Sequence, residues 1–147
     1  MSDPTPPMNT TSSPTTPAAD KRRRAVIVDD SRAMRTILSR IVGGLGFQTT
    51  AAADGREAFA LLDEAAPPDL LVTDWNMPEV TGYELVRMVR ARPAFATVKI
   101  VMVTTETELS QISAAMDAGA DEYVMKPFTA DIMLDKLRML GLAEEAS

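Results

Sequence analysis

The chain has 147 residues, a length typical of one domain with a sizeable core, and 46% of its residues are apolar. It contains no cysteine or histidine, which excludes disulfides, zinc sites with Cys or His ligands, thiol nucleophiles and Ser-His-Asp triads. The net charge of -6 disfavours nucleic-acid binding, and no apolar run approaches the roughly 20 residues of a membrane helix. No signal-peptide pattern is present, so we expect a cytoplasmic protein with neither nucleic acid nor membrane as partner.

The composition changes near residue 20. Residues 1–20 are rich in Pro, Thr and Ser and hold almost no large apolar side chains, which predicts a disordered tail. The tail is interpreted as a spacer, with phosphorylation or docking as the alternative. Residues 21–147 are predicted to form one folded domain, and the basic run 21–24 is interpreted as the solvated start of its first strand.

Five apolar segments alternate with five segments of helical periodicity. The predicted strands are 25–28, 47–52, 70–72 leading into Asp74, 99–103 and 122–125. The predicted helices are 32–44, a segment from the N-cap Asp54 to before Pro67, 82–91, 107–118 and 129–140. Such alternation with short loops predicts an α/β fold, a doubly wound parallel sheet with helices on both faces.

Each predicted helix carries an apolar stripe, the side expected to pack on the sheet. The stripes are Met34, Ile37, Leu38, Ile41 and Leu45; Ala58, Leu61 and Leu62; Leu85, Met88 and Val89; Leu109, Ile112 and Met116; and Ile132, Met133, Leu137 and Leu140. For Ile112, a core position and a partner contact both remain open.

Polar residues stand where four of the strands end. Asp29 and Asp30 follow the first strand, Asp74 the third, Thr104 the fourth and Lys126 the fifth. In an open parallel sheet, ligands bind beyond the carboxyl ends of the strands. Each residue alone is more typical of a cap or a loop, but their joint placement predicts one site.

The residue types indicate the chemistry of that site. Three neighbouring carboxylates repel one another unless a cation compensates, and an all-oxygen set selects a hard cation such as Mg²⁺. Lys126 supplies a positive charge and Thr104 a hydroxyl donor, which suits a transferring phosphoryl group. Asp74 is the predicted acceptor, and Asp29 and Asp30 are the predicted metal ligands.

These residues carry a resemblance to a known family. Over about residues 22–141 the chain resembles response-regulator receiver domains, most closely the stand-alone chemotaxis regulators of the CheY type. The matching segments are VDDS at 28–31, MR at 34–35, TDWNMP at 73–78, VMVT at 101–104 and YVMKPFT at 123–129.

The resemblance implies the flavodoxin-like strand order 2-1-3-4-5 and a defined site. Asp74 would receive a phosphoryl group from a partner histidine kinase. Asp30, the Asp74 carboxylate and the Asn76 backbone carbonyl would coordinate Mg²⁺, with Asp29 acting largely through water. Lys126 would pair with the phosphoryl group, and the peptide bond from Lys126 to Pro127 would be cis.

The resemblance also implies a switch. Thr104 would shift toward the phosphoryl group and let Tyr123 turn inward. The surface so changed would comprise the helix 107–118, the strand 122–125 and the helix 129–140, with Ile112, Tyr123 and Lys136 at partner-contact positions.

Some positions depart from the family pattern. Thr105 stands where a small residue follows the switch threonine, and we expect it to crowd Tyr123 or alter the phosphoryl lifetime. Ser31 replaces a larger residue after the aspartate pair. Asn76 and Glu106 match choices that tune dephosphorylation and imply a short-lived phosphoryl group.

The expected function is therefore a phosphorylation-controlled binding module, not an enzyme with turnover. No output domain is expected after the last helix, so output would pass through protein contact, most simply with a flagellar switch component in chemotaxis. An adaptor or phosphate sink in another phosphorelay is the alternative. A haloacid-dehalogenase-like phosphatase is disfavoured because Asn76 stands where such enzymes carry a second acid, and an unphosphorylated scaffold because every phosphorylation residue is present.

Overall fold

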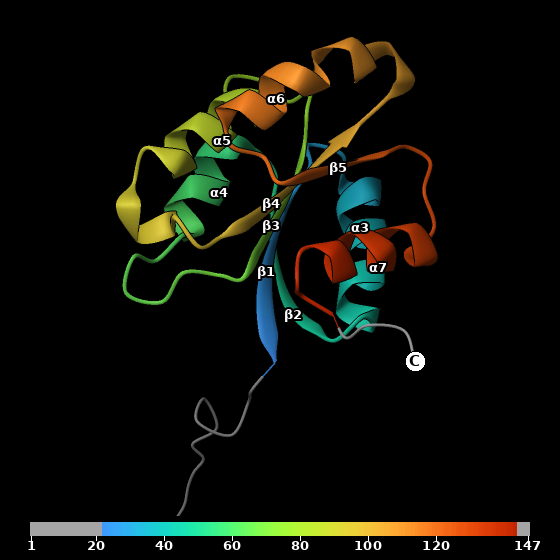
Figure 1. The fold of residues 1–147 in the computed structure, drawn as a ribbon, viewed down its shortest axis with the longest axis horizontal. Coiled ribbons are helices and arrows are strands. Elements are labelled where there is room, and N and C mark those ends of the chain that lie inside the picture. Colours follow the sequence, from blue (N-terminus) through green and yellow to red (C-terminus); the bar gives the residue numbers. More distant parts are fainter. Residues whose placement is uncertain (1–21, 144–147) are drawn as a thin grey trace, which may run out of the picture.

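A five-stranded parallel sheet lies at the centre of the fold in a computed structural model that describes residues 22–143 (Figure 1). The strands are β1 (Arg23–Val28), β2 (Phe47–Ala52), β3 (Leu70–Asp74), β4 (Lys99–Thr104) and β5 (Glu122–Met125). Their order is β2-β1-β3-β4-β5 and every neighbouring pair is parallel. The predicted fold class and strand order are confirmed, while the predicted tail 1–20 lies outside the described residues.

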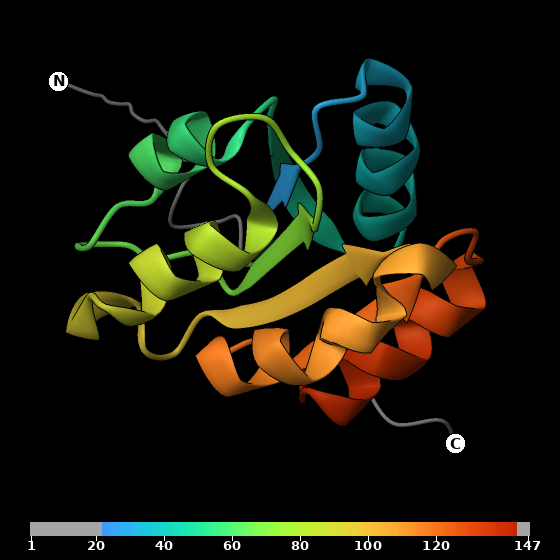
Figure 2. The same cartoon turned by 90° about the horizontal axis from the view of Figure 1, so that it is seen from above.

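Five α-helices cover the two faces of this sheet. They are α3 (Arg32–Gly44), α4 (Gly55–Leu61), α5 (Gly82–Arg90), α6 (Ile112–Ala118) and α7 (Ala130–Met139). Figures 1 and 2 show α3 and α7 on one face and α4, α5 and α6 on the other. Capping side chains fix where helices begin, because Ser31, Asp54, Thr81 and Thr129 each accept a hydrogen bond from the first turn of a helix.

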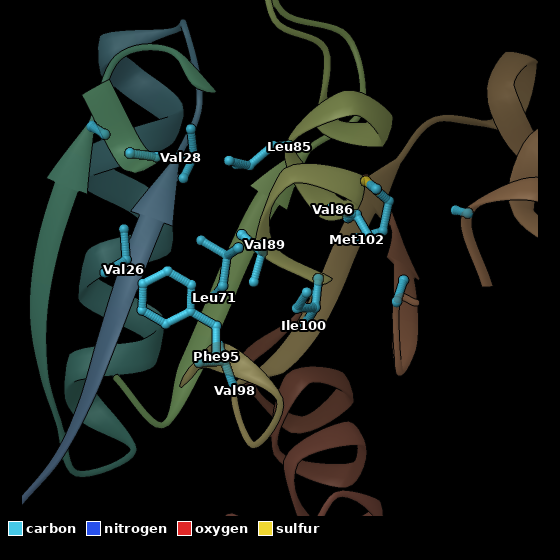
Figure 3. Packing of buried hydrophobic residues seen from close by; sticks show 14 of the residues in the cluster. Val26, Val28, Leu71, Leu85, Val86, Val89, Phe95, Val98, Ile100 and Met102 are labelled. Carbon is cyan, nitrogen blue, oxygen red and sulfur yellow. The ribbon is translucent and has the colours of Figure 1, made fainter. Parts of the chain in front are cut away.

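The strands are buried on both faces, so alternate side chains enter two separate cores. Val26, Val28 and Leu71 pack with Phe95 and the α5 residues under α4, α5 and α6 (Figure 3). Ile27 and Val72, one residue further along their strands, pack instead with Leu38, Met133 and Leu137 under α3 and α7. The continuous β-branched runs of the sequence follow from this two-sided burial.

The predicted helix 107–118 is only partly right. Residues Glu106–Gln111 form a 3-10 helix, η3, and the α-helix starts at Ile112. The small Ala115 is the side chain that α6 buries fully, while Leu109 and Met116 are exposed. A small residue lets the helix approach the sheet closely, so the larger apolar residues of the stripe face outward.

Three further apolar side chains point away from the core, because their helices face the sheet with a different side from the one predicted. Ile37, Leu61 and Ile132 were expected in the core but are exposed. A stripe gives the period of a helix but not its rotation about its axis. In α3 and α7 the deepest positions are Leu38 with Val42 and Met133 with Leu137, which turns Ile37 and Ile132 toward solvent.

Over residues 22–143 the structure has no helix with the length and apolar character needed to cross a membrane.

Candidate active site

The carboxyl ends of β1, β3, β4 and β5 bring the predicted polar residues together. Asp29 directly follows β1, Asp74 ends β3, Thr104 ends β4 and Lys126 directly follows β5. The strand order places β1 and β3 side by side at the centre, so their acids become neighbours although they are far apart in the sequence.

Three carboxylates form the floor of the site. One carboxylate oxygen from each of Asp29, Asp30 and Asp74 lies within 4.8 Å of the other two. Asp29 is 1% exposed and Asp74 6% exposed, whereas Asp30 is exposed to solvent. Burial and the neighbouring Asp29 charge raise the pKa of Asp74 from 3.8 to about 6, against the opposing effect of Lys126.

Lys126 is the cation of this cluster. Its Nζ lies 3.3 Å from Asp29 Oδ2 and 3.3 Å from Asp74 Oδ1. Burial lowers the pKa of Lys126, but the Asp74 and Asp29 carboxylates outweigh it and the pKa is raised. The Lys126 N–H donates to the Thr104 carbonyl at 2.7 Å, and the Lys126-Pro127 peptide is cis, as the resemblance implied.

Local contacts hold the two buried aspartates in place. The Ser31 N–H donates to Asp29 Oδ1 at 2.8 Å, and the Arg35 guanidinium donates to the Asp29 carbonyl at 2.8 Å. Under Asp74, Gly82 packs so closely that an added Cβ would collide with the Asp74 carbonyl oxygen. The loop between them is thus pressed against the end of β3.

The donor set fits a hard divalent cation. It consists of carboxylate oxygens without sulfur or imidazole, and two of its three acids are buried side by side with one lysine to balance them. Burial and the Asp29 charge raise the pKa of Asp74 despite Lys126, and a bound cation would favour its ionised form. Asn76 lies in the exposed loop two residues after Asp74.

Thr104 has a partner that the sequence reasoning missed. Its hydroxyl, on a fully buried residue, lies 3.2 Å from the Thr105 carbonyl oxygen and 3.3 Å from Glu108 Oε1, and either oxygen can accept its proton. The Thr105 N–H also donates to Glu108 Oε1, at 3.0 Å. Thr105 and Glu108 have the S/T-x-x-E spacing that is typical of a helix start. This pattern is the sequence signal that could have predicted the backbone contact.

The predicted partner-contact residues are brought together in part. Tyr123 is half-buried against the core beneath α4, α5 and α6, and Lys136 Nζ lies 5.1 Å from the centre of its ring. Lys136 also pairs with Glu122 at 2.8 Å. Ile112 opens α6 as a half-buried side chain.

Comparison with known proteins identifies the family. The family model described as "Response regulator receiver domain" matches residues 25–138. The chain belongs to the response regulator receiver domain family. It is similar to the chemotaxis protein CheY of Pseudomonas aeruginosa, at 44% identity over 78% of this chain and 92% of that one.

Solved structures give the same relationship. The Vibrio cholerae chemotaxis protein CheY4 is similar with a TM-score of 0.74 and 34% identity over 81% of this chain and 98% of that one. The receiver domain of sensor histidine kinase PA1611 from Pseudomonas aeruginosa, solved with a magnesium ion in its active site cleft, has a TM-score of 0.73 and 25% identity over 82% of this chain and 98% of that one. This chain is a CheY-like response regulator receiver of two-component signalling.

Proposed function

We propose that Asp74 accepts a phosphoryl group from a histidine kinase in the presence of Mg²⁺, and that this switches a protein-binding face. The observation that carries the proposal is the burial of Asp74 between a second carboxylate and a lysine, with a third carboxylate in reach. The folded receiver is proposed to span residues 21–147.

The reaction is a phosphoryl transfer between two side chains. A carboxylate oxygen of Asp74 forms a bond to phosphorus as the phosphorus–nitrogen bond of the donor's phosphohistidine breaks. The electron pair of that bond stays on the imidazole nitrogen, which then takes up a proton. The product is an aspartyl phosphate on this chain, and its hydrolysis restores Asp74, so the chain acts as a switch and not as an enzyme with a released product.

Several residues have proposed parts in that transfer. Asp30, Asp74 and the Asn76 carbonyl would hold Mg²⁺, with Asp29 acting largely through water. When bound, Mg²⁺ would offset the repulsion between the carboxylates and the phosphoryl oxygens. Lys126, already 3.3 Å from Asp74 Oδ1, is placed to pair with the phosphoryl group.

The surface next to the site supports docking of a kinase segment. An apolar pocket of about 290 Å³ adjoins Lys126 and is lined by Met34, Ile37, Pro127 and Phe128. Ile37 is 47% exposed and extends the apolar surface of this pocket that a docked partner would cover. An apolar helix face seated there would bring a phosphohistidine toward Asp74.

The output face would be α6, β5 and α7, with Ile112, Tyr123 and Lys136 as contacts. Thr104 would move toward the phosphoryl group and Tyr123 would turn inward. Exposed apolar side chains on the same three elements, Met116, Met125 and Ile132, support a protein partner. The chemotaxis relatives favour a flagellar switch component as that partner, and an adaptor or phosphate sink in another relay is the second candidate.

Labelling tests the phosphoacceptor directly. The chain is incubated with radiolabelled acetyl phosphate, with and without Mg²⁺, beside Asp74→Asn and Thr104→Ala variants. We expect Mg²⁺-dependent label on the wild type and on Thr104→Ala, and none on Asp74→Asn. Equal labelling of the wild type and Asp74→Asn would show that Asp74 is not the acceptor.

A binding experiment tests the output. Flagellar switch proteins are presented to the chain with and without beryllofluoride, a mimic of the bound phosphoryl group. Binding that rises with beryllofluoride and falls in Lys136→Ala supports motor control. Unchanged binding would favour the relay alternative.

A further inference from the structure

The switch threonine is not free in this structure. The Thr104 hydroxyl has two acceptors within hydrogen-bond distance, the Thr105 carbonyl oxygen at 3.2 Å and Glu108 Oε1 at 3.3 Å. Of these two acceptors the ionised carboxylate forms the stronger hydrogen bond. Glu108 is half-buried and lies in η3, directly before α6.

We propose that Glu108 is a positioning residue that holds the Thr104 hydroxyl in the unphosphorylated protein and competes for it with the phosphoryl group on Asp74. This inference rests on the proposed phosphorylation of Asp74. It adds a residue whose bond to Thr104 must break each time the switch operates.

The competition follows from the number of protons. A hydroxyl has one O–H and can donate it to one strong acceptor at a time. A phosphoryl group on Asp74 brings oxygens that carry between one and two negative charges, so it is the better acceptor once present. Until then, the bond to Glu108 stabilises the resting position of Thr104 and opposes the phosphorylated state.

The geometry places the Glu108 charge within reach of the site. Glu108 Oε1 lies 3.3 Å from the hydroxyl of Thr104, which ends β4, and Asp74 ends the neighbouring strand β3. A phosphoryl group on Asp74 would bring further negative charge and repel Glu108. Repulsion and loss of the Thr104 hydroxyl act together, so both favour movement of Glu108 away from the site.

Movement of Glu108 has a direct route to the output face. Its Oε1 also binds the Thr105 N–H at 3.0 Å, and Leu109 and Ile112 follow on η3 and α6. The start of η3 is thereby tied to Thr104 through one carboxylate oxygen. When Thr104 turns to the phosphoryl group, Glu108 Oε1 loses one of its two hydrogen bonds. Phosphorylation would thereby affect η3 by a route that does not involve Tyr123.

Beryllofluoride titration in the presence of Mg²⁺ tests the inference. Binding is followed by the fluorescence of Trp75, the single tryptophan of the chain and the residue next to Asp74. We compare Glu108→Ala, which removes the acceptor, with Glu108→Gln, which keeps an uncharged one. The matched control is Glu57→Gln, because Glu57 likewise accepts a backbone N–H, that of Ala53 at 2.7 Å, but at the start of α4.

We expect Glu108→Ala to lower the beryllofluoride concentration at half-saturation by about three- to tenfold, the effect of losing one hydrogen bond that opposes binding. Glu108→Gln should give a smaller shift in the same direction, and Glu57→Gln none. In a Thr104→Val background the shift caused by Glu108→Ala should lose most of its size, because no hydroxyl remains to compete for. Urea unfolding of each variant establishes that it is folded.

Two results would overturn the inference. The first is that both Glu108 variants reach half-saturation at the same beryllofluoride concentration as the wild type. The other is a shift that keeps its full size in Thr104→Val, which would mean that Glu108 acts by charge alone. Acetyl phosphate labelling separates this failure from failure of the proposed function, because a wild type that labels at Asp74 retains that function whatever the Glu108 variants do.

Discussion

Asp74→Asn should stabilise the metal-free protein at neutral pH. The pKa of Asp74 is 3.8 in an unstructured chain and about 6 in the fold, because burial and the Asp29 charge disfavour its ionised form. The folded state therefore holds the Asp74 proton more tightly than the unfolded state. Ionisation of Asp74 lowers stability as the pH rises from 3.8 to about 6, and the full loss is present above that window.

The magnitude follows from the size of the shift. A change from 3.8 to about 6 corresponds to about 3 kcal/mol above the window, at about 1.4 kcal/mol per pKa unit. This shift already includes the opposing effect of Lys126, whose Nζ lies 3.3 Å from Asp74 Oδ1, so loss of that ionic contact is not subtracted again. In the variant Lys126 keeps its contact with Asp29, and we expect a gain of about 3 kcal/mol.

Urea unfolding in EDTA measures this gain. At pH 7.5 the variant should unfold at higher urea than the wild type, and at pH 5 the difference should fall to about half, since Asp74 is then largely protonated in the fold. Adding Mg²⁺ should stabilise the wild type more than the variant. Asp117→Asn, at an exposed position of α6, is the control and should change little.

Two results would refute the reasoning. A variant that is less stable than the wild type in EDTA at pH 7.5 would show that Asp74 is well compensated without metal. A gain that does not change between pH 7.5 and pH 5 would show that ionisation of Asp74 is not its source.

Three further variants test other parts of the structure. Gly82→Ala should lower the free energy of unfolding by about 2 kcal/mol or more, because its Cβ would collide with the Asp74 carbonyl, whereas Gly44→Ala has open space and serves as the control in thermal unfolding. Lys126→Met should raise the pKa of Asp74 above about 6, since Lys126 lowers it, which an NMR titration of the carboxyl carbon would measure. Arg90→Ala should destabilise by about 3 kcal/mol in urea, because its guanidinium binds backbone carbonyls of two loops and the Asp121 carboxylate at 2.9 Å.

The arrangement of the site could be predicted because it depends on the backbone. A parallel sheet sends the carboxyl end of every strand to one edge, so residues that follow the strands in sequence converge there. Asp29, Asp74, Thr104 and Lys126 converge for this reason, and no side-chain detail was needed.

The rotation of the helices could not be predicted in the same way. An apolar stripe on α3 is compatible with burial or with exposure, and Ile37 is exposed beside an apolar pocket. Likewise Ala115, and not Leu109 or Met116, faces the core from the α6 region. Which side is covered depends on the distance between helix and sheet, a tertiary property that periodicity does not contain.

Thr105, which departs from the family pattern, makes hydrogen bonds with two nearby residues. From the sequence it was expected to crowd Tyr123 or alter the phosphoryl lifetime. In the structure its hydroxyl lies 2.9 Å from the Thr107 hydroxyl, and its N–H donates to Glu108 Oε1. The hydroxyl contact from Thr105, the N-cap of η3, to Thr107 adds a hydrogen bond at the start of η3 that an alanine could not form. If Thr104 moves toward Asp74 as proposed, this segment must follow or release it. We therefore expect Thr105 and Glu108 to act in the same direction, because both stabilise the loop in the unphosphorylated conformation and would oppose the proposed active one.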